Sequence, residues 1–401
     1  MTLLSDAERA MIGGIANQPI LERTLTWANI NSGTGNLSGL ARMADLLGQA
    51  FSALPGEVRL IDPDPVEQVG ADGTVRDVRH GQHLLVRVRP DAPRRVVLTG
   101  HMDTVYGVED AFQQCDWTDE RTLHGPGTAD MKGGISLMLA GLKAFESSAP
   151  ELGYDVLINS DEETGSASSA RLIAELAQGK LAALTYEPPL LNGNMARARP
   201  GSGNFSAVIR GRSAHAGRNP EDGRNAVLAA SDLALRLAAM VEPGLSLNPA
   251  KIDGGGPNNL VPALAILRFN MRPQEAEMME RALVQIEALI AEVARAHDVS
   301  IHLHGGMGRP PKTITTATER LYALVRQASL DLGQPMEWQD TGGVCDGNNI
   351  AACGVPVLDT MGAPGGAIHS PDEFLQVDML APRAALTALV MHRLDRHKEP
   401  L

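Results

Sequence analysis

The 401-residue sequence has few of the features that mark several common classes of protein. Aromatic residues make up only 3% of it, and its three cysteines, Cys115, Cys345 and Cys353, show no Cys-x-x-Cys spacing. An odd number of scattered cysteines argues against a disulfide framework and fits a reducing compartment. No apolar run is long enough to span a bilayer, and residues 1–19 lack the basic start and apolar core of a signal peptide. We therefore expect a cytoplasmic protein without membrane contacts.

Clusters of positive charge are also absent. The 35 Lys and Arg against 48 Asp and Glu give a net charge of −13. Because nucleic acids and acidic membranes are bound by clustered Lys and Arg, neither is an expected partner. The hydrophobic share of 43% is ordinary for a soluble globular protein, and 41 glycines indicate many tight turns. A chain of this length usually folds into two domains.

The pattern of apolar residues divides the chain into three segments. Over residues 1–195 and 310–401, short apolar strands such as residues 96–99 and 154–159 alternate with amphipathic helices. This alternation is typical of an α/β fold with a mostly parallel sheet. Residues 196–309 instead follow the order β-α-β-β-α-β, which predicts a small α+β sheet covered by two helices. We therefore expect a discontinuous larger domain with a smaller domain inserted in it.

Carboxylates and imidazoles follow the ends of the predicted strands in the larger domain. In α/β sheets these ends open into one crevice, where ligands bind. The crevice would hold five carboxylates, which repel one another unless cations lie among them. Mixed nitrogen and oxygen donors suit zinc or a similar divalent ion. The residues concerned are His101, Asp103, Asp130, Glu162, Glu163, Glu187 and His369.

Four motifs resemble those of the co-catalytic zinc metallopeptidase family. They are residues 100–105, 127–134, 161–165 and 368–370, and they occur in the family's order along nearly the whole chain. The family contains glutamate carboxypeptidase, aminoacylase, acetylornithine deacetylase and succinyl-diaminopimelate desuccinylase. The sequence is most similar to the glutamate carboxypeptidase branch, and the resemblance implies a zinc-peptidase catalytic domain with an inserted lid and dimerisation domain.

The resemblance also implies a role for each residue of the crevice. Two zinc ions, with cobalt or manganese as alternatives, would be bridged by Asp130. One ion would also bind His101 and Glu187, and the other would bind Glu163 and His369. Glu162 would be the general base for a water between the ions, and Asp103 would orient His101. The Asp130–Met131 peptide bond is expected to be cis, as is common in this family.

A second group of residues resembles the part of the family's site that binds substrate. His215 resembles the lid histidine that reaches the substrate carbonyl, often from the partner subunit. Asn259 and Arg272 resemble the residues that hold a substrate carboxylate, for which a guanidinium is well suited. The alternatives are an exposed loop histidine, a surface salt bridge of Arg272, and Asn258 in place of Asn259. Gly365 and Gly366 either offer backbone groups to the substrate or form a plain turn, and residues 345–349 match no family pattern.

These observations predict a metal-dependent hydrolase with a small-molecule substrate and no nucleic-acid partner. The glutamate at position 187, by resemblance, favours cleavage of an amide bond next to a free carboxylate, as in a carboxypeptidase or an N-acyl-amino-acid deacylase. A narrow biosynthetic deacylase such as acetylornithine deacetylase is the alternative enzyme, and a metal-binding relative without catalysis is the alternative outside enzymes. The lid is expected to form a homodimer through an exposed sheet edge, and a monomer, as in some members of the family, is the alternative.

Overall fold

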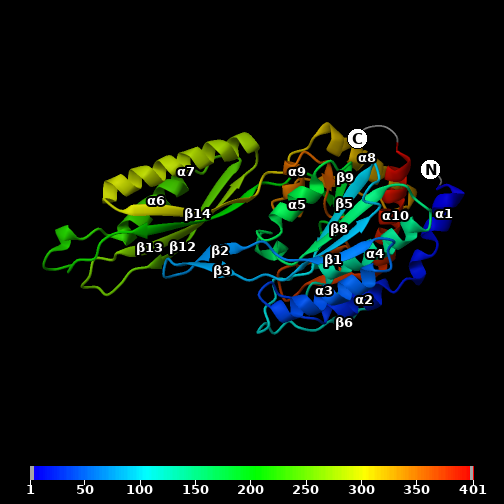
Figure 1. Ribbon diagram of the computed structural model, residues 1–401, viewed down its shortest axis with the longest axis horizontal. Helices are drawn as coiled ribbons and strands as arrows, with labels where there is room; N and C mark the ends of the chain where they lie inside the picture. Colours follow the sequence, from blue (N-terminus) through cyan, green and yellow to red (C-terminus); the bar gives the residue numbers. More distant parts are fainter. Residues whose placement is uncertain (1–3, 398–400) are drawn as a thin grey trace.

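The computed structural model describes residues 4–397 and 401, which form a larger and a smaller unit (Figure 1). A six-stranded sheet organises the larger unit, in the order β1-β4-β8-β5-β9-β16. The first three positions are β1 (Glu57–Ile61), β4 (His83–Val88) and β8 (Gly153–Asn159), followed by β5 (Arg95–His101), β9 (Ala182–Thr185) and β16 (Val357–Leu358). β8, β5, β9 and β16 run parallel, whereas β1 and β4 are antiparallel to their neighbours. The prediction of a mostly parallel sheet in an α/β fold is therefore confirmed.

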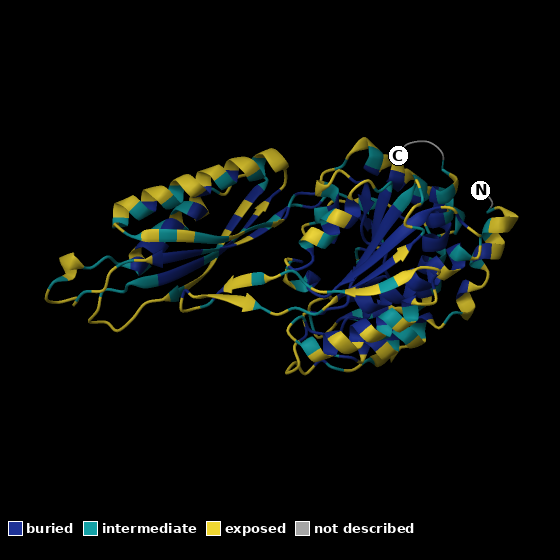
Figure 2. Ribbon diagram, viewed as in Figure 1, coloured by how far each residue is buried: buried dark blue, intermediate teal, exposed yellow. Residues whose placement is uncertain are grey.

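Helices cover both faces of this sheet because successive strand residues point to opposite sides. Val96 and Leu98 of β5 face the larger core, whereas Val97 between them faces the second core. The larger core includes residues of α1 (Asp6–Ile12), α2 (Ile20–Ala28), α3 (Leu37–Phe51), α4 (Gly133–Glu146), α8 (Thr316–Asp331) and α10 (Leu380–Arg396). The second core includes residues of α5 (Ala170–Ala177) and α9 (Asp346–Ala352). Figure 2 shows the sheet as a buried layer inside the larger unit.

The smaller unit has the predicted order β-α-β-β-α-β and a core of its own. Its elements are β11 (Ser202–Arg210), α6 (Ala226–Ala239), β12 (Leu245–Gly254), β13 (Leu264–Pro273), α7 (Ala276–His297) and β14 (Ser300–Arg309), with the antiparallel sheet order β12-β13-β11-β14. The last strand, β14, continues through the glycines at 305 and 306 to Arg309. Gly305 makes this extension fit, since it has φ +91° and a Cβ there would lie 2.1 Å from the Asn204 carbonyl oxygen.

A hairpin that the sequence pattern did not predict links the two units. It consists of β2 (Val66–Val69) and β3 (Val75–Val78), and Figure 1 shows it reaching from the larger unit toward the smaller one. Val69 packs with Val208 and Ile266 of the small sheet. The carbonyl oxygen of Val69 accepts a hydrogen bond from Arg268 Nη2 at 2.8 Å, so the hairpin tip is bound to the smaller unit.

The remaining elements are short. Two small sheets consist of β6 (Asp116–Asp119), β7 (Thr122–His124), β17 (Gly365–Gly366) and β18 (Phe374–Gln376), and of β10 (Met195–Ala196) and β15 (Trp338–Gln339). Single helical turns lie at Ile15–Asn17, Thr128–Lys132, Glu162–Thr164, Pro220–Asp222 and Val377–Met379. The loop that follows β15 leads into α9 at Asp346. In the part of the chain described, no helix has the length and apolarity needed to cross a membrane.

Candidate metal centre

The imidazoles and carboxylates predicted from the sequence meet at one end of the larger sheet. His101 is the last residue of β5, Glu162 and Glu163 lie in the turn after β8, and Glu187 lies two residues beyond β9. These three strands are parallel neighbours, so their carboxyl ends open at the same edge. Asp130 joins them from the turn Thr128–Lys132 that precedes α4.

Two groups of side chains that could hold a metal ion share Asp130. One comprises His101, Asp130 and Glu187, and the other comprises Asp130, Glu163 and His369; in each, the donor atoms lie within 4.8 Å of one another. Asp130 Oδ1 is 3.0 Å from His101 Nε2, while Asp130 Oδ2 is 3.3 Å from His369 Nε2. His369 Nε2 is also 3.1 Å from Glu163 Oε2. The two oxygens of one carboxylate thus face two different donor groups.

Asp103 supports this cluster from behind. The Nδ1 atom of His101 is 3.0 Å from the Asp103 carbonyl oxygen and 3.5 Å from its Oδ1, which directs Nε2 toward Asp130. The Asp103 carboxylate also accepts hydrogen bonds from the backbone N–H groups of Glu162 and Glu163 at 3.1 and 3.2 Å. One buried carboxylate therefore orients the imidazole and fixes the turn that carries both glutamates.

Glu373 holds the turn of Asp130 and was not singled out from the sequence. Its Oε1 accepts hydrogen bonds from the N–H groups of Ala129 and Asp130 at 2.9 and 3.0 Å. Its Oε2 accepts from the Gly127 N–H and from the Tyr106 hydroxyl. The peptide bond between Asp130 and Met131 is cis, which confirms that prediction. Because Glu373 follows His369 by four residues, it links the loop that carries His369 to the turn that carries Asp130.

The pKa values reflect the crowding of charge in the crevice. Burial, reinforced by the charge of Asp130, raises the pKa of Glu163 to about 8. Burial alone would lower the pKa of His101, but hydrogen bonds to Asp103 and Asp130, among others, outweigh burial and raise it. Hydrogen bonds to Asp130 and Glu163 raise the pKa of His369 to about 11. The direction of these shifts indicates that the crevice favours added positive charge, which a divalent cation among oxygen and imidazole donors would supply.

A large cavity between the two units opens onto the cluster. Its lining includes Asp130, Glu162, Glu163, Glu187 and His369 from the larger unit, and Asn204, Asn270, Arg272, His304 and Arg309 from the smaller one. His304, which belongs to none of the four motifs, also lines the cavity. The polar face of the small sheet therefore lies opposite the metal-binding side chains.

Arg272 and the two glycines lie along this cavity. Arg272 donates from Nε to Asn270 Oδ1 at 3.0 Å and from Nη1 to the Gly342 carbonyl oxygen at 3.1 Å. Within residues 4–397 and 401 it forms no salt bridge, which was the alternative interpretation. Gly365 and Gly366 form β17 rather than a plain turn, and a Cβ on Gly365 would lie 2.2 Å from the Phe374 carbonyl oxygen.

His215 and Asn259 do not lie in this cavity within one chain. They meet at one end of the smaller unit, where the Ala216 N–H donates to the Asn259 carbonyl oxygen at 2.9 Å. Both side chains, and that of Asn258, are exposed. The structure thus brings these residues to each other but not to the metal-binding cluster.

Arg309 is a further residue that the sequence pattern did not reveal. Its Nη1 lies 2.6 Å from Glu162 Oε1, and both side chains are buried. Burial raises the pKa of Glu162 to about 6, although the charge of Arg309 acts in the opposite direction. No motif includes Arg309, and the only nearby signal in the sequence is the pair Pro310-Pro311 that follows it.

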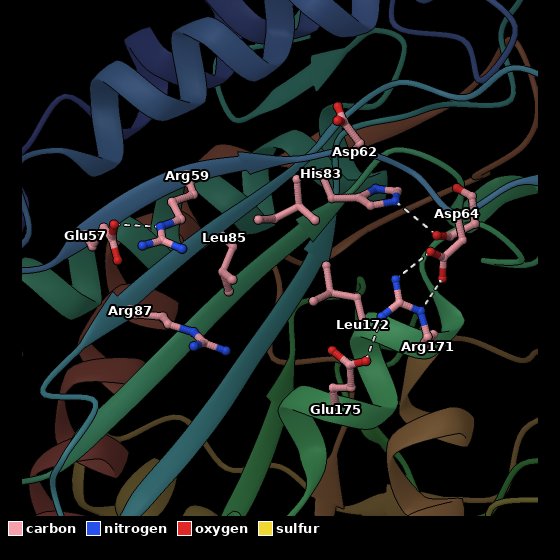
Figure 3. A pocket seen from close by; sticks show the side chains of 12 residues that line it. Glu57, Arg59, Asp62, Asp64, His83, Leu85, Arg87, Arg171, Leu172 and Glu175 are labelled. Atoms are coloured by element: carbon pink, nitrogen blue, oxygen red, sulfur yellow. Dashed lines mark hydrogen bonds and ion pairs between the residues drawn. The ribbon is translucent and has the colours of Figure 1, made fainter.

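A second groove lies between β1, β4 and α5, away from the cluster (Figure 3). Two of its arginines, Arg59 and Arg171, are already paired with carboxylates of the same groove. Arg59 lies 2.6 Å from Glu57, and Arg171 lies 2.6 and 2.7 Å from Asp64 and Glu175. Because these guanidinium groups are neutralised by the groove itself, it presents no comparable candidate site.

Known proteins resemble this chain over most of its length. The model of the peptidase family M20/M25/M40 matches residues 97–393. Carboxypeptidase G2 from Pseudomonas sp. (strain RS-16) is 28% identical over 393 residues, covering 95% of this chain and 91% of that protein. A succinyl-diaminopimelate desuccinylase from Xanthomonas campestris pv. campestris (strain 8004) is 30% identical over 329 residues, covering 75% of this chain and 83% of that protein.

Solved structures show the same fold at lower identity. An M20 family metallo-carboxypeptidase from Sulfolobus solfataricus gives a TM-score of 0.72 at 12% identity, covering 95% of this chain and 100% of that one. A tripeptidase from Staphylococcus aureus gives a TM-score of 0.73 at 22% identity, covering 95% of this chain and 99% of that one.

Proposed function

Because the chain belongs to the peptidase family M20/M25/M40 and is a hydrolase of peptide or amide bonds, we propose that it cleaves an amide bond next to a free carboxylate. It would act as a carboxypeptidase or an N-acyl-amino-acid deacylase. The observation that carries this proposal is the sharing of Asp130 by two donor groups at the floor of the cavity. We assign residues 1–195 and 310–401 to the catalytic domain and residues 196–309 to the lid.

The donor groups would hold two zinc ions, or cobalt or manganese. His101, Asp130 and Glu187 would bind one ion, and Asp130, Glu163 and His369 would bind the other. When bound, such ions polarise a substrate carbonyl and make water more acidic. Asp103 would keep the Nε2 lone pair of His101 directed at its ion through the contacts with Nδ1.

Glu162 would be the general base and later the general acid. It would accept a proton from the attacking water and deliver it to the leaving nitrogen. Its pKa near 6, raised by burial, suits proton transfer near neutral pH. Its location in the same cavity as both donor groups supports this role.

Arg272 would bind the free carboxylate of the substrate. It lies on β13 of the lid, faces the same cavity and has no carboxylate partner among the residues described. A guanidinium and a carboxylate can form two parallel hydrogen bonds, which would orient the scissile amide toward the metal centre. Backbone groups of Gly365 and Gly366 line the cavity beside it.

A homodimer would supply His215 and Asn259. The edge strand β12 is unpaired on its outer side, and the adjacent helix α6 exposes Leu228 and Leu235 at 58% and 73%. An exposed strand edge beside an apolar helix face is suited to pairing with a second copy. We propose that this pairing brings the partner's His215 to the substrate carbonyl and the partner's Asn259 to its carboxylate.

A hydrolysis panel on metal-reconstituted protein tests the proposal. It would contain N-acyl amino acids, N-blocked dipeptides, N-acetylornithine and N-succinyl-diaminopimelate, each with its C-terminal carboxamide as matched control where this can be made. We expect chelator-sensitive cleavage of acids and much slower cleavage of carboxamides. Selective cleavage of N-acetylornithine alone would favour the biosynthetic deacylase. Cleavage that resists the chelator, or no cleavage of any compound, would contradict the proposal, and the latter result would favour a non-catalytic relative.

A further inference from the structure

The side chain of Arg309 passes from the smaller unit into the larger one. Arg309 is the last residue of β14, where it pairs with Ser202 of β11, and it is only 5% exposed. Its Nη1 lies 2.6 Å from Glu162 Oε1, and its Nη2 donates to the Glu162 carbonyl oxygen at 2.9 Å. Arg309 therefore holds Glu162 by both its side chain and its backbone.

Only one oxygen of the Glu162 carboxylate is held in this way. Within residues 4–397 and 401, its other oxygen, Oε2, makes no hydrogen bond or ion pair. A carboxylate that transfers a proton uses one oxygen at a time, so fixing Oε1 limits rotation of the group while Oε2 stays available. The backbone of Glu162 is fixed independently by the hydrogen bond from its N–H to Asp103.

The start of α9 fixes Arg309 in turn. Asn348 Nδ2 donates to the Pro310 carbonyl oxygen at 2.8 Å, and Asn349 Nδ2 donates to the Gly308 carbonyl oxygen at 2.8 Å. The carbonyl groups of the residues before and after Arg309 are therefore held by adjacent asparagines. Asp346 Oδ1 lies 3.5 Å from Arg309 Nη2 and accepts a hydrogen bond from Ser166 Oγ at 2.5 Å. These contacts give residues 345–349, which matched no family pattern, a physical role.

We propose that Arg309, braced by Asp346, Asn348 and Asn349, is a positioning residue that sets the orientation of the Glu162 carboxylate for proton transfer. This inference rests on the proposed function of Glu162. A role in binding the substrate carboxylate fits Arg309 poorly, because Nη1 and Nη2 both contact protein groups. Arg272, in contrast, has only Asn270 and the Gly342 carbonyl oxygen as partners among the residues described.

Substitution of Arg309 tests this role through the separate behaviour of kcat and KM. For Arg309→Met we expect kcat to fall by about 100-fold, with KM within about threefold and bound metal unchanged, because losing an oriented base typically costs 10²–10⁴-fold. Arg309→Lys should recover part of kcat, and added guanidinium should partly rescue Arg309→Ala. Arg89→Met is the matched control, since it removes a partly buried bidentate pair with Glu146 in another part of the larger unit. It should leave kcat and KM unchanged.

Three results would overturn the proposal. The first is a rise in KM with unchanged kcat, and the second is a loss of bound metal that parallels the loss of activity. The third is a further fall in kcat, below that of Glu162→Gln alone, when Arg309→Met is combined with Glu162→Gln.

Thermal unfolding of Arg309→Met, Glu162→Gln and the double variant tests the pairing without turnover. We expect the loss of stability in the double variant to be smaller than the sum of the losses in the two single variants, because each single variant leaves a buried group unpaired. If the parent enzyme is inactive on the whole panel, the proposed function fails, whereas additive unfolding shifts would overturn the pairing itself.

Discussion

The two parts of the candidate site differ in how completely a single chain builds them. The proposed metal-binding floor is largely buried apart from the exposed His369, three of its donors lie at or just beyond the ends of neighbouring strands, and Asp103 and Glu373 fix its turns through hydrogen bonds. The end of the smaller unit that carries His215 and Asn259 is exposed and lies outside the cavity. On the proposed function, one folded chain would be enough to hold the metal ions, whereas His215 and Asn259 would reach the substrate only in a second copy or after a movement of the smaller unit.

The largest effect is expected at the floor. Glu162→Gln should keep both metal ions but lower kcat by about 10³-fold or more, because the amide cannot accept a proton from water. Metal analysis and steady-state kinetics on the same preparation measure both properties. Glu163→Gln is the matched control, and it should lose metal as well as activity. Substantial turnover by Glu162→Gln would remove Glu162 as the base.

His215→Ala tests the other half of the comparison. It should lower kcat by roughly 10²–10³-fold, as expected for the loss of a group that stabilises an oxyanion. When the inactive Glu162→Gln and His215→Ala proteins are mixed and allowed to exchange subunits, about a quarter of the activity should return, because a two-fold dimer then contains one intact shared site. Failure of every mixture to regain activity would show that His215 acts within its own chain or not at all.

Arg272→Met should affect binding more than turnover. We expect KM to rise by about 10- to 100-fold with a smaller change in kcat, since a hydrogen bond to a charged group contributes about 1.5–3 kcal/mol. Arg272→Lys should be intermediate because lysine keeps the charge but loses the fork of donors. Kinetics on an acid substrate and its carboxamide distinguish the cause. Equal losses on both compounds would contradict a carboxylate-binding role.

Asp346 gives the smallest predicted effect, on stability. Burial raises its pKa to about 6, so between pH 4 and 6 the folded state binds more protons than the unfolded state. The contribution of this group to stability is therefore full below about pH 4 and is lost as the pH rises through 6. As the pH rises from 4 to 6, the free energy of unfolding of Asp346→Asn should increase relative to that of the parent by up to roughly 3 kcal/mol, because a shift of one pKa unit corresponds to about 1.4 kcal/mol. Urea unfolding of the metal-free proteins at several pH values measures this difference. If the unfolding free energies of parent and variant changed with pH in parallel, the prediction would be contradicted.

The sequence predicted best those features that depend on neighbouring residues. The strand of residues 96–99 ends at His101 because its apolar run stops there, and parallel neighbours then bring Glu163 and Glu187 to the same edge. The order of elements in the smaller unit followed from alternating helical and strand periods in the same way. The cis peptide bond between Asp130 and Met131 was predicted from the family resemblance, since no sequence periodicity indicates such a bond.

Features that depend on distant contacts were not predictable from patterns. Arg309 is separated from Glu162 by 147 residues, and its importance arises only when the two units fold together. Glu373 lies 243 residues from the N–H of Asp130 that it binds. The hairpin Val66–Val69 and Val75–Val78 has short strands with mixed exposure, so the alternation of apolar and polar residues along each strand was too short to identify. Its position becomes clear only from its contacts with Val208 and Ile266.

The central claim, that Asp130 is shared by two metal ions, is tested most directly by anomalous X-ray scattering. Crystals of zinc-loaded protein would be measured at the zinc absorption edge. The account predicts two peaks, one on each side of the Asp130 carboxylate, the first beside His101 and Glu187 and the second beside Glu163 and His369. A single peak, no peak, or peaks away from these side chains would contradict it.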